Sequence, residues 1–159
     1  MTWEPYQALY IHIPFCKRRC LYCDFDTNAV DRDSPEIDEY FDDLVLQVRR
    51  EAKAGNLAHI KTIFLGGGPP SYVGARRLDA LLQVLALSLD IDSCEGTMEA
   101  NPESLTESLV KGVYALGVNR LSIGVQSFDD NVLKLLGRVH DADMAKKAID
   151  VAHERFENV

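Results

Sequence analysis

The chain has 159 residues, of which 47% are hydrophobic and 26% charged, and its formal net charge is -8. A chain of this length can form one hydrophobic core, and its composition excludes a disordered protein. It has no basic cluster beyond Lys17-Arg18-Arg19, which argues against a nucleic-acid partner because phosphate binding needs a basic surface.

No targeting or membrane-spanning segment is predicted. Residues 1–6 contain no basic region followed by an apolar run, which a signal peptide would need. No stretch approaches the roughly 20 apolar residues of a transmembrane helix. We therefore expect a cytoplasmic protein, in which a reducing environment keeps clustered cysteines free for metal or redox chemistry.

Short β-rich segments alternate with amphipathic helical segments along the chain. Strands are expected at residues 8–13, 62–65, 97–100 and 120–125. Apolar residues recur at helical spacing between and after them, which predicts helices at about 35–54, 78–89, 105–116, 130–137 and 141–154. Ser104 and Glu107 have the spacing of a capping box, which would begin the third helix at Ser104.

The order is therefore a strand followed by a helix, four times, with one additional helix in the last unit. This alternation predicts an α/β fold with a parallel sheet and right-handed crossovers. Doubly wound sheets and β/α barrels share the pattern, and four units do not close a barrel. A fifth strand is expected to begin at residues 156–159, so we interpret the chain as part of a longer protein, truncated at its C-terminus.

Unusual residues follow each predicted strand. Because parallel strands point the same way, these residues should converge on the rim formed by the carboxyl ends of the strands, where such folds place their active sites. In chain order they are Cys16, Cys20, Cys23, Gly66, Gly67, Gly68, Glu99 and Gln126.

The three cysteines have the spacing C-x3-C-x2-C. Three thiolates on a tight loop can hold three irons of a [4Fe–4S] cluster and leave the fourth iron open to a ligand. The alternative is a structural zinc site, but such sites usually have four ligands. Cys94 precedes the third strand and so belongs to the opposite rim, and His12 lies inside the first strand. The spacing alone allows either site, and the lack of a suitable fourth ligand favours a cluster over zinc.

The other rim residues also have ordinary structural explanations. A glycine run after a strand is often only a tight turn, and a lone glutamate such as Glu99 is usually solvated. Gln126 could be a loop amide and Arg138 a charge at a helix C-terminus. Beside the cysteines, however, Glu99 could accept a hydrogen bond from a ribose or an ammonium group, and Arg138 could pair with a carboxylate. The Lys17-Arg18-Arg19 run is expected to offset thiolate charge.

Five motifs together resemble one known family, the radical S-adenosylmethionine (SAM) enzymes related to oxygen-independent coproporphyrinogen III oxidase. Within that group the sequence is most similar to the heme chaperone branch, HemW. The motifs cover nearly the whole chain: Tyr10-Ile-His-Ile-Pro-Phe-Cys16 through Cys23-Asp24-Phe25, Gly66-Gly-Gly-Pro-Pro-Ser71, Glu99-Ala-Asn-Pro102, Asn119-Arg-Leu-Ser-Ile-Gly-Val-Gln-Ser-Phe128 and Leu136-Gly-Arg-Val-His140.

The resemblance implies a partial (β/α) radical SAM barrel, with residues 1–159 as the N-terminal part of its core domain. It implies that Cys16, Cys20 and Cys23 bind a [4Fe–4S] cluster whose open iron SAM chelates. It also implies SAM contacts at seven positions of this chain: Tyr10, Tyr22, Gly67, Gly68, Glu99, Gln126 and Arg138. Further partners would be heme or a porphyrin, a reduced electron donor and a heme-acceptor protein.

Three departures from the oxidase pattern bear on function. Phe25 stands where the oxidase has a fourth cysteine, which favours the chaperone branch. Pro69 replaces the usual threonine of the glycine motif and removes a backbone N–H and a hydroxyl. The remaining strands and the C-terminal domain, which includes the heme-binding segment of the chaperones, are not in this chain. The leading hypothesis is a heme chaperone; the alternatives are the radical oxidase of porphyrin synthesis, and a structural zinc-binding or inactive truncated domain.

Overall fold

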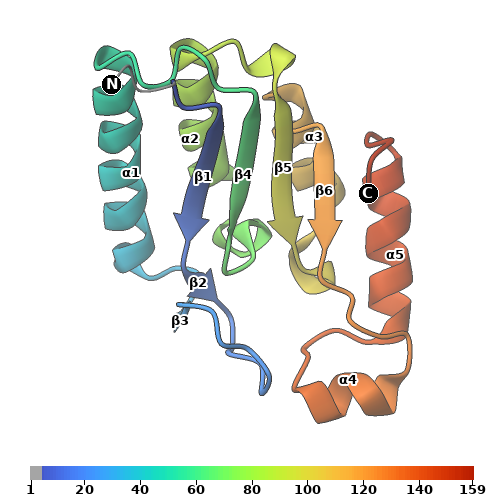
Figure 1. Ribbon diagram of the computed structural model, residues 1–159. Coiled ribbons are helices and arrows are strands. Elements are labelled where there is room, and N and C mark those ends of the chain that lie inside the picture. Colours follow the sequence, from blue (N-terminus) through green and yellow to red (C-terminus); the bar gives the residue numbers. More distant parts are fainter. Residues whose placement is uncertain (1–4) are drawn as a thin grey trace.

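The computed structural model describes residues 5–159, so the first four residues of the segment tested for a signal peptide lie outside the described part. Its centre is a parallel sheet with the strand order β1-β4-β5-β6 (Figure 1). The strands are β1 (Ala8–Ile13), β4 (Thr62–Gly67), β5 (Glu95–Ala100) and β6 (Arg120–Ile123). Two further strands of two residues each, β2 (Phe15–Cys16) and β3 (Asn28–Ala29), pair below the main sheet.

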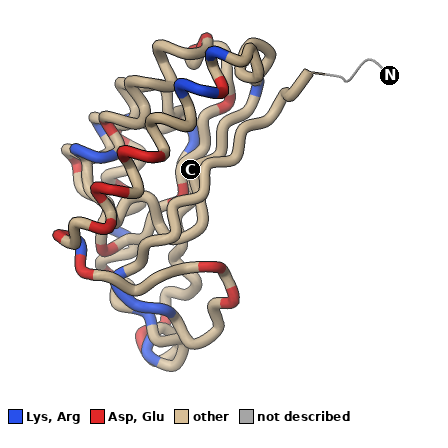
Figure 2. Tube along the Cα trace, turned by 90° about the vertical axis from the view of Figure 1, so that its left-hand side faces the viewer, with Lys and Arg blue, Asp and Glu red and all other residues tan. Residues whose placement is uncertain are grey.

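Five α-helices connect or follow the strands. They are α1 (Pro35–Lys53), α2 (Ala75–Ser88), α3 (Glu107–Ala115), α4 (Asp130–Leu136) and α5 (Ala142–His153). The 3-10 turns are η1 (Pro70–Val73), η2 (Ile91–Ser93) and η3 (Pro102–Ser104). Helices α1, α2 and α3 lie on one side of the sheet, as the two perpendicular views show (Figure 1, Figure 2). Within residues 5–159, no helix is both long and apolar enough to cross a membrane.

The hydrophobic core lies between the sheet and these helices. Alternate strand residues point toward the helices, and Ile13, Leu65 and Met98 are completely buried there. Helix α2 contributes a row of leucines to the same core, among them Leu81 and Leu85. The opposite face of the sheet carries side chains that are more exposed, such as Tyr10 and Phe64.

The predicted order of strands and helices is confirmed, with changes at several boundaries. Strand β4 includes Gly66 and Gly67, which were expected to follow it. Asn158 forms a parallel bridge with Arg120 of β6, and its carbonyl accepts a hydrogen bond of 3.0 Å from the Leu121 N–H. This pairing lies where the sequence predicts the start of a fifth strand.

The predicted start of α3 at Ser104 is wrong. Residues 102–104 form the 3-10 turn η3, and the Ser104 hydroxyl lies 2.6 Å from that of Ser71. Thr106 caps the helix instead, because its side-chain oxygen accepts a hydrogen bond from the Leu109 N–H at 3.3 Å. Ser104, which matched the local capping pattern, thus contacts Ser71 of a distant segment and does not cap α3.

Candidate functional site

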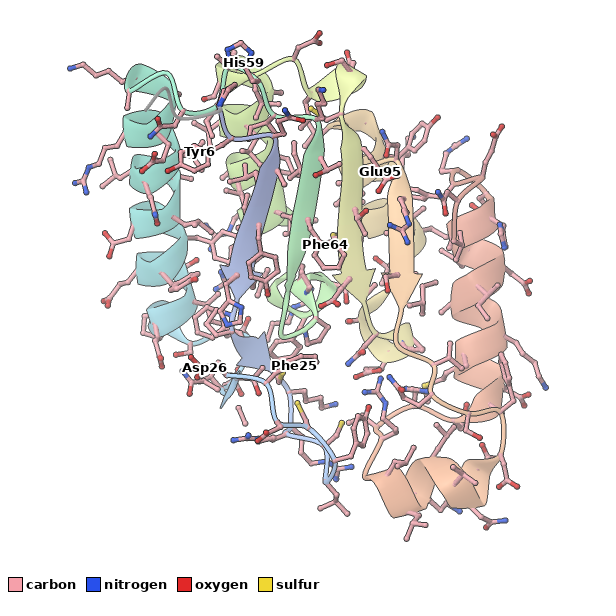
Figure 3. The ribbon with its side chains drawn as sticks, viewed as in Figure 1. Tyr6, Phe25, Asp26, His59, Phe64 and Glu95 are labelled. Atoms are coloured by element: carbon pink, nitrogen blue, oxygen red, sulfur yellow. The ribbon has the colours of Figure 1, made fainter. Side chains whose placement is uncertain are left out.

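A cavity of about 300 Å³ opens at the carboxyl ends of the strands, between these ends and the cysteine loop. Figure 3 shows Phe25, which lines it, at this end of the sheet, and Glu95 near the opposite end. Eight of the ten residues predicted for the cluster and SAM line this cavity: Cys16, Cys20, Tyr22, Cys23, Gly67, Glu99, Gln126 and Arg138. The expected convergence of separate segments on one rim is therefore observed.

Backbone hydrogen bonds close the cysteine loop at both ends. Strand β2, which ends at Cys16, pairs in parallel with β3, and the Val30 N–H donates to the Cys16 carbonyl at 3.2 Å. Inside the loop, the Cys23 N–H donates to the Cys20 carbonyl at 3.1 Å. All three cysteines are free, with Cys16 buried and the other two half-buried. The fold thus presents three thiols along one short, tied loop.

The far side of the cysteine loop rests on the C-terminal end of α4. The Leu21 N–H donates to the Leu136 carbonyl at 3.2 Å, and the Arg18 guanidinium donates to the Gly137 carbonyl. Gly137 has φ 76° and ends the helix in the left-handed conformation that glycine tolerates. A helix terminus more than a hundred residues further along the chain therefore fixes the position of the loop.

Arg138, the next residue, joins the loop to the strand ends. Its guanidinium donates to the Gly124 carbonyl at 2.6 Å and to Asn101 Oδ1 at 2.9 Å. It also contacts Cys20 Sγ at 3.5 Å and the Tyr22 hydroxyl at 3.3 Å. The Lys17-Arg18-Arg19 run was expected to offset thiolate charge, but Arg138 provides the guanidinium that contacts a cysteine sulfur.

Protonation of Cys16 reflects its surroundings. Burial raises the pKa of the Cys16 thiol, while the neighbouring Thr27 hydroxyl and the charge of Arg138 act in the opposite direction. Without a metal, the thiol form of Cys16 is therefore favoured more than in water. Metal ligation at this position would release a proton, as it does at cysteine sites in general.

Glu99 lies at the end of β5 with its carboxylate turned toward β4. One of its oxygens accepts a hydrogen bond from the Gly67 N–H at 3.2 Å. Burial raises the pKa of Glu99, and the Gly67 hydrogen bond partly opposes that shift. Gly67 has φ 113°, and a Cβ there would lie 2.6 Å from the His12 ring, so only glycine fits. The close approach keeps this backbone N–H within reach of Glu99.

Gln126 has an unusual backbone conformation. Its φ is 68°, and it is the one non-glycine among the described residues with positive φ. Such a conformation costs about 1–2 kcal/mol for a residue with a Cβ. It lies at the cavity, three residues after the end of β6. Strain of this kind is commonly found at binding sites, which agrees with the predicted role of Gln126.

Two predicted residues lie outside the cavity lining. The Tyr10 hydroxyl lies 2.9 Å from His12 Nδ1 on the open face of the sheet, and Tyr10 is 57% exposed. The Gly68 N–H donates to the Ile13 carbonyl at 2.8 Å, and a Cβ at Gly68 would collide with the backbone of Phe15. Gly68 therefore has a structural reason to be glycine, and its predicted SAM contact, like that of Tyr10, remains a prediction.

Asn101 and Thr27 are among the cavity residues that were not singled out from the sequence. Asn101 belongs to a motif after the third predicted strand, so its position could have identified it. Thr27 is buried beside the cavity, and no sequence pattern pointed to it. Thr27 Oγ1 and Arg138 Nε are buried without a hydrogen-bond partner among residues 5–159. Buried polar atoms of this kind usually bind water or a ligand, so they fit a polar molecule in the cavity.

A zinc ion and a [4Fe–4S] cluster need different arrangements of the side chains that bind them. In the described part of the chain, no three His, Cys, Asp or Glu side chains are close enough to hold a single metal ion. A zinc site needs its ligands around one ion, whereas the cysteines of a [4Fe–4S] cluster bind different irons. Three thiols on one loop are the ligand set that a cluster needs, and cluster ligation stays a prediction.

Known proteins resemble the chain in sequence and structure. The heme chaperone HemW of Haemophilus influenzae is 39% identical over 152 residues, which cover 93% of this chain and 40% of that protein. HemW of Bacillus subtilis is 38% identical over 157 residues, covering 96% and 41%. Among solved structures, Escherichia coli coproporphyrinogen III oxidase (HemN), described as a radical SAM enzyme, superposes with a TM-score of 0.83 at 28% identity, covering 96% of this chain and 35% of that one.

The chain thus spans about 40% of the length of the curated relatives that it matches. Its four-stranded parallel sheet and helices correspond to part of the radical SAM barrel. A family model described as the radical SAM superfamily matches residues 10–159. Because this match covers nearly the whole sequence, the chain belongs to the radical SAM superfamily.

Proposed function

We propose that this chain is the cofactor-binding part of a heme chaperone, in which Cys16, Cys20 and Cys23 hold a [4Fe–4S] cluster beside a bound SAM. Superfamily membership implies a [4Fe–4S] cluster and SAM as cofactors. The observation that supports this assignment of residues is their convergence. Three free thiols share one cavity with Glu99, Gln126 and Arg138, which come from three other segments of the fold.

The chemistry of Arg138 and Glu99 supports a role for each of them beside the cluster. When bound, a reduced [4Fe–4S] cluster can supply one electron to the sulfonium of SAM. Arg138 carries a fixed positive charge and an unpaired Nε, which suit the carboxylate of SAM. Glu99 offers a carboxylate held by the Gly67 N–H, which suits a ribose hydroxyl or an ammonium group.

The choice of a heme chaperone rests on two observations. The curated relatives quoted above carry that name and are 38–39% identical, whereas the HemN oxidase structure is 28% identical. Phe25 lines the cavity with 66% of its surface exposed, at the position where the resemblance places a fourth cysteine of the oxidase. Heme, a reduced electron donor and a heme-acceptor protein would be the partners, with the heme-binding segment outside this chain.

A second candidate is the oxidase reaction itself, because the HemN structure superposes so well with this fold. The test uses a version of this protein with the full length of its heme chaperone relatives. Heme titration followed by absorption spectroscopy should give a stoichiometric complex, and anaerobic incubation with coproporphyrinogen III should give no decarboxylated product. Product formation would identify an oxidase instead.

The cluster assignment has a direct test in this chain. Anaerobic reconstitution with iron and sulfide should give a brown protein with about four irons per chain. Cys16→Ala should lose most of this iron. Cys94→Ala is the matched control, since Cys94 is also buried and free but lies outside the cavity. A colourless wild-type protein that retains zinc, or equal iron in both variants, would refute the assignment.

A further inference from the structure

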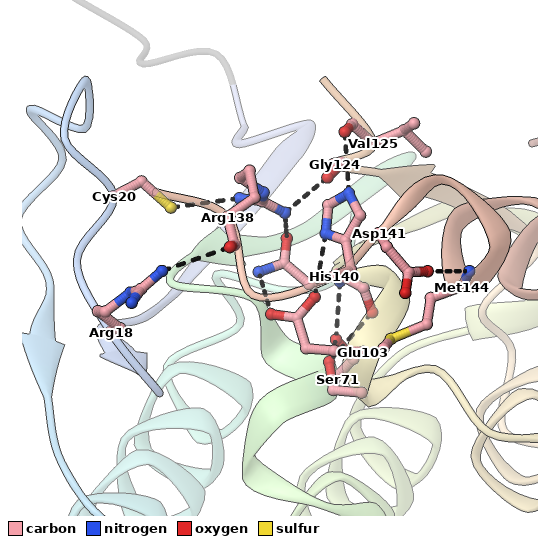
Figure 4. Close-up of polar contacts among 12 residues, drawn as sticks. Arg18, Cys20, Ser71, Glu103, Gly124, Val125, Arg138, His140, Asp141 and Met144 are labelled. Carbon is pink, nitrogen blue, oxygen red and sulfur yellow. Dashed lines mark hydrogen bonds and ion pairs between the residues drawn. The ribbon is translucent and has the colours of Figure 1, made fainter. Parts of the chain in front are cut away.

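A line of polar contacts runs from the cysteine loop to the buried residue His140 (Figure 4). It begins at Cys20, passes through Arg138 and Asn101, and continues to Glu103 and His140. Cys20, Arg138 and Asn101 line the cavity, whereas Glu103 and His140 are not among its lining residues. The last two therefore act on any ligand there only through the residues in front of them.

The amide of Asn101 can satisfy both neighbours in one orientation only. Its Nδ2 donates to Glu103 Oε1 at 3.2 Å, and its Oδ1 accepts from Arg138 Nη2 at 2.9 Å. A carboxylate oxygen accepts and a guanidinium donates, so a flipped amide would place donor against donor and acceptor against acceptor. Glu103 thereby determines which atom of Asn101 faces Arg138.

The position of Asn101 is restricted from two other directions. Its backbone N–H donates to the Ser71 hydroxyl at 3.1 Å. A Cβ at Gly124 would lie 2.9 Å from Asn101 Oδ1 and 3.5 Å from Arg138 Nη2, so the strand end leaves space that these two groups fill. The strand end therefore holds the Asn101 amide against the Arg138 guanidinium, and Glu103 accepts a hydrogen bond from the other side of the same amide.

His140 holds Glu103 in turn. His140 Nε2 lies 3.0 Å from the Val125 carbonyl, which only accepts, so Nε2 carries a hydrogen. Nδ1 faces Glu103 Oε2 at 3.4 Å, and neither atom has a hydrogen-bond partner elsewhere among the described residues. The His140 side chain is completely buried. The buried imidazole thus faces one carboxylate oxygen of Glu103 and leaves the other, Oε1, to accept from Asn101.

We propose that Glu103 and His140 are positioning residues that, through Asn101, hold the Arg138 guanidinium against Cys20 and the cavity. The proposal rests on the proposed function, because its consequence is the affinity for SAM beside a cluster. A purely structural pair would affect only the stability of the fold. A positioning pair also affects how Arg138 presents its charge to a carboxylate, while the three cysteines stay in place.

Two substitutions of Glu103 separate these roles. Glu103→Ala removes the acceptor for Asn101 and should weaken SAM binding about tenfold, as measured by titration calorimetry on reconstituted protein, with unchanged iron content. Glu103→Gln can accept from Asn101 and donate to His140, so it should stay within about threefold of the wild type. Glu107→Ala, an exposed carboxylate on the next helix, is the control and should change nothing.

A second measurement needs no cluster. In the metal-free protein, hindered rotation of the Arg138 guanidinium gives separate Nη proton signals by NMR. These signals should be present in the wild type and Glu103→Gln, and averaged in Glu103→Ala. If Glu103→Ala does not fold, His140→Gln replaces it, with an expected loss of SAM affinity of about threefold.

The outcomes distinguish the two proposals. Failure of the wild type to bind iron or SAM would refute the proposed function, and the NMR signals would still test the positioning role. If Glu103→Ala or His140→Gln loses stability but keeps SAM affinity and the Arg138 signals, the pair is structural and the inference is wrong. It is also wrong if Glu107→Ala weakens SAM binding equally.

Discussion

Glu99 and Gln126 are held in states that each cost free energy in the cofactor-free protein. The carboxyl of Glu99 is partly withdrawn from water, and the backbone of Gln126 is left-handed. Such costs persist where the surrounding structure fixes them, and they are frequent where a ligand binds. Both residues lie at the cavity, so single substitutions there should separate stability from binding.

Glu99→Gln should stabilise the cofactor-free protein at neutral pH. Burial raises the pKa of Glu99, so the folded state binds a proton over a range where the unfolded state has released it, and stability falls as pH rises through that range. Gln cannot ionise, so the melting temperature of the variant should exceed the wild-type value at about pH 7. The increase should be at most about 3 °C, because water screens the half-buried carboxylate. At about pH 4 the two should agree. Circular dichroism melts test this, and a rise that is equal at both pH values would contradict it.

Gln126→Gly and Gln126→Ala remove the same side chain but differ at the backbone. Both should weaken SAM binding by about tenfold if the amide contacts the ligand. Only glycine accepts the positive φ without strain, so Gln126→Gly should be more stable than Gln126→Ala by about 1 kcal/mol. Urea unfolding measures the difference. Equal stabilities would show that residue 126 does not keep this conformation in solution.

Helix α4 is the element on which the cysteine loop rests. It has only seven residues, and isolated helices of this length are unstable in water. Asp129 caps its first turn by accepting hydrogen bonds from the Asn131 and Val132 N–H groups at 2.8 and 3.3 Å. Its other end receives the loop through Leu21 and Arg18. The cap and the loop therefore stabilise the helix from its two ends.

Asp129→Ala should lower the free energy of unfolding by about 1 kcal/mol and speed the loss of iron from reconstituted protein. Asn is an equally good cap, so Asp129→Asn should preserve both properties. Lys134→Ala, on the exposed surface of the same helix, is the second control. Urea unfolding and iron release to a chelator provide the measurements. Iron release that is unchanged in Asp129→Ala would mean that the loop does not depend on α4.

Strands and helices could be predicted from the sequence where the burial of their apolar residues determines them. They were less predictable where contacts between residues far apart in the sequence determine them. Apolar periodicity fixed the order of strands and helices, because alternate strand residues such as Ile63 and Leu65 must face the core. The start of α3 was missed because Ser71, far away in sequence, engages Ser104. The position of the site, at the carboxyl ends of the strands, could be predicted from the direction of the strands alone. The contacts of Arg138 did not, because they depend on where side chains point after the chain has folded.

The whole molecule has a sheet that is covered on one side by α1, α2 and α3 (Figure 1, Figure 2). On the other face, Tyr10 and Phe64 stack with their ring centroids 6.1 Å apart, and Tyr10 is more than half exposed. Charged residues are concentrated on the helices and loops (Figure 2). The cavity lies at the carboxyl ends of the strands of this sheet.

Neighbouring residues of β4 provide a test of this one-sided arrangement. Leu65 faces the helices and is completely buried, whereas Phe64 faces the open side and is only partly buried. Leu65→Ala should lower the free energy of unfolding by about 2–5 kcal/mol, because it leaves a cavity in the core. Phe64→Ala removes a larger side chain, yet it should cost only about 1 kcal/mol, since water can fill the space and the stack with Tyr10 contributes little. Urea unfolding of dilute protein measures both. Equal costs would mean that the open face is covered in solution, for example by a second copy of the chain, and a dependence of the Phe64→Ala effect on protein concentration would identify that case.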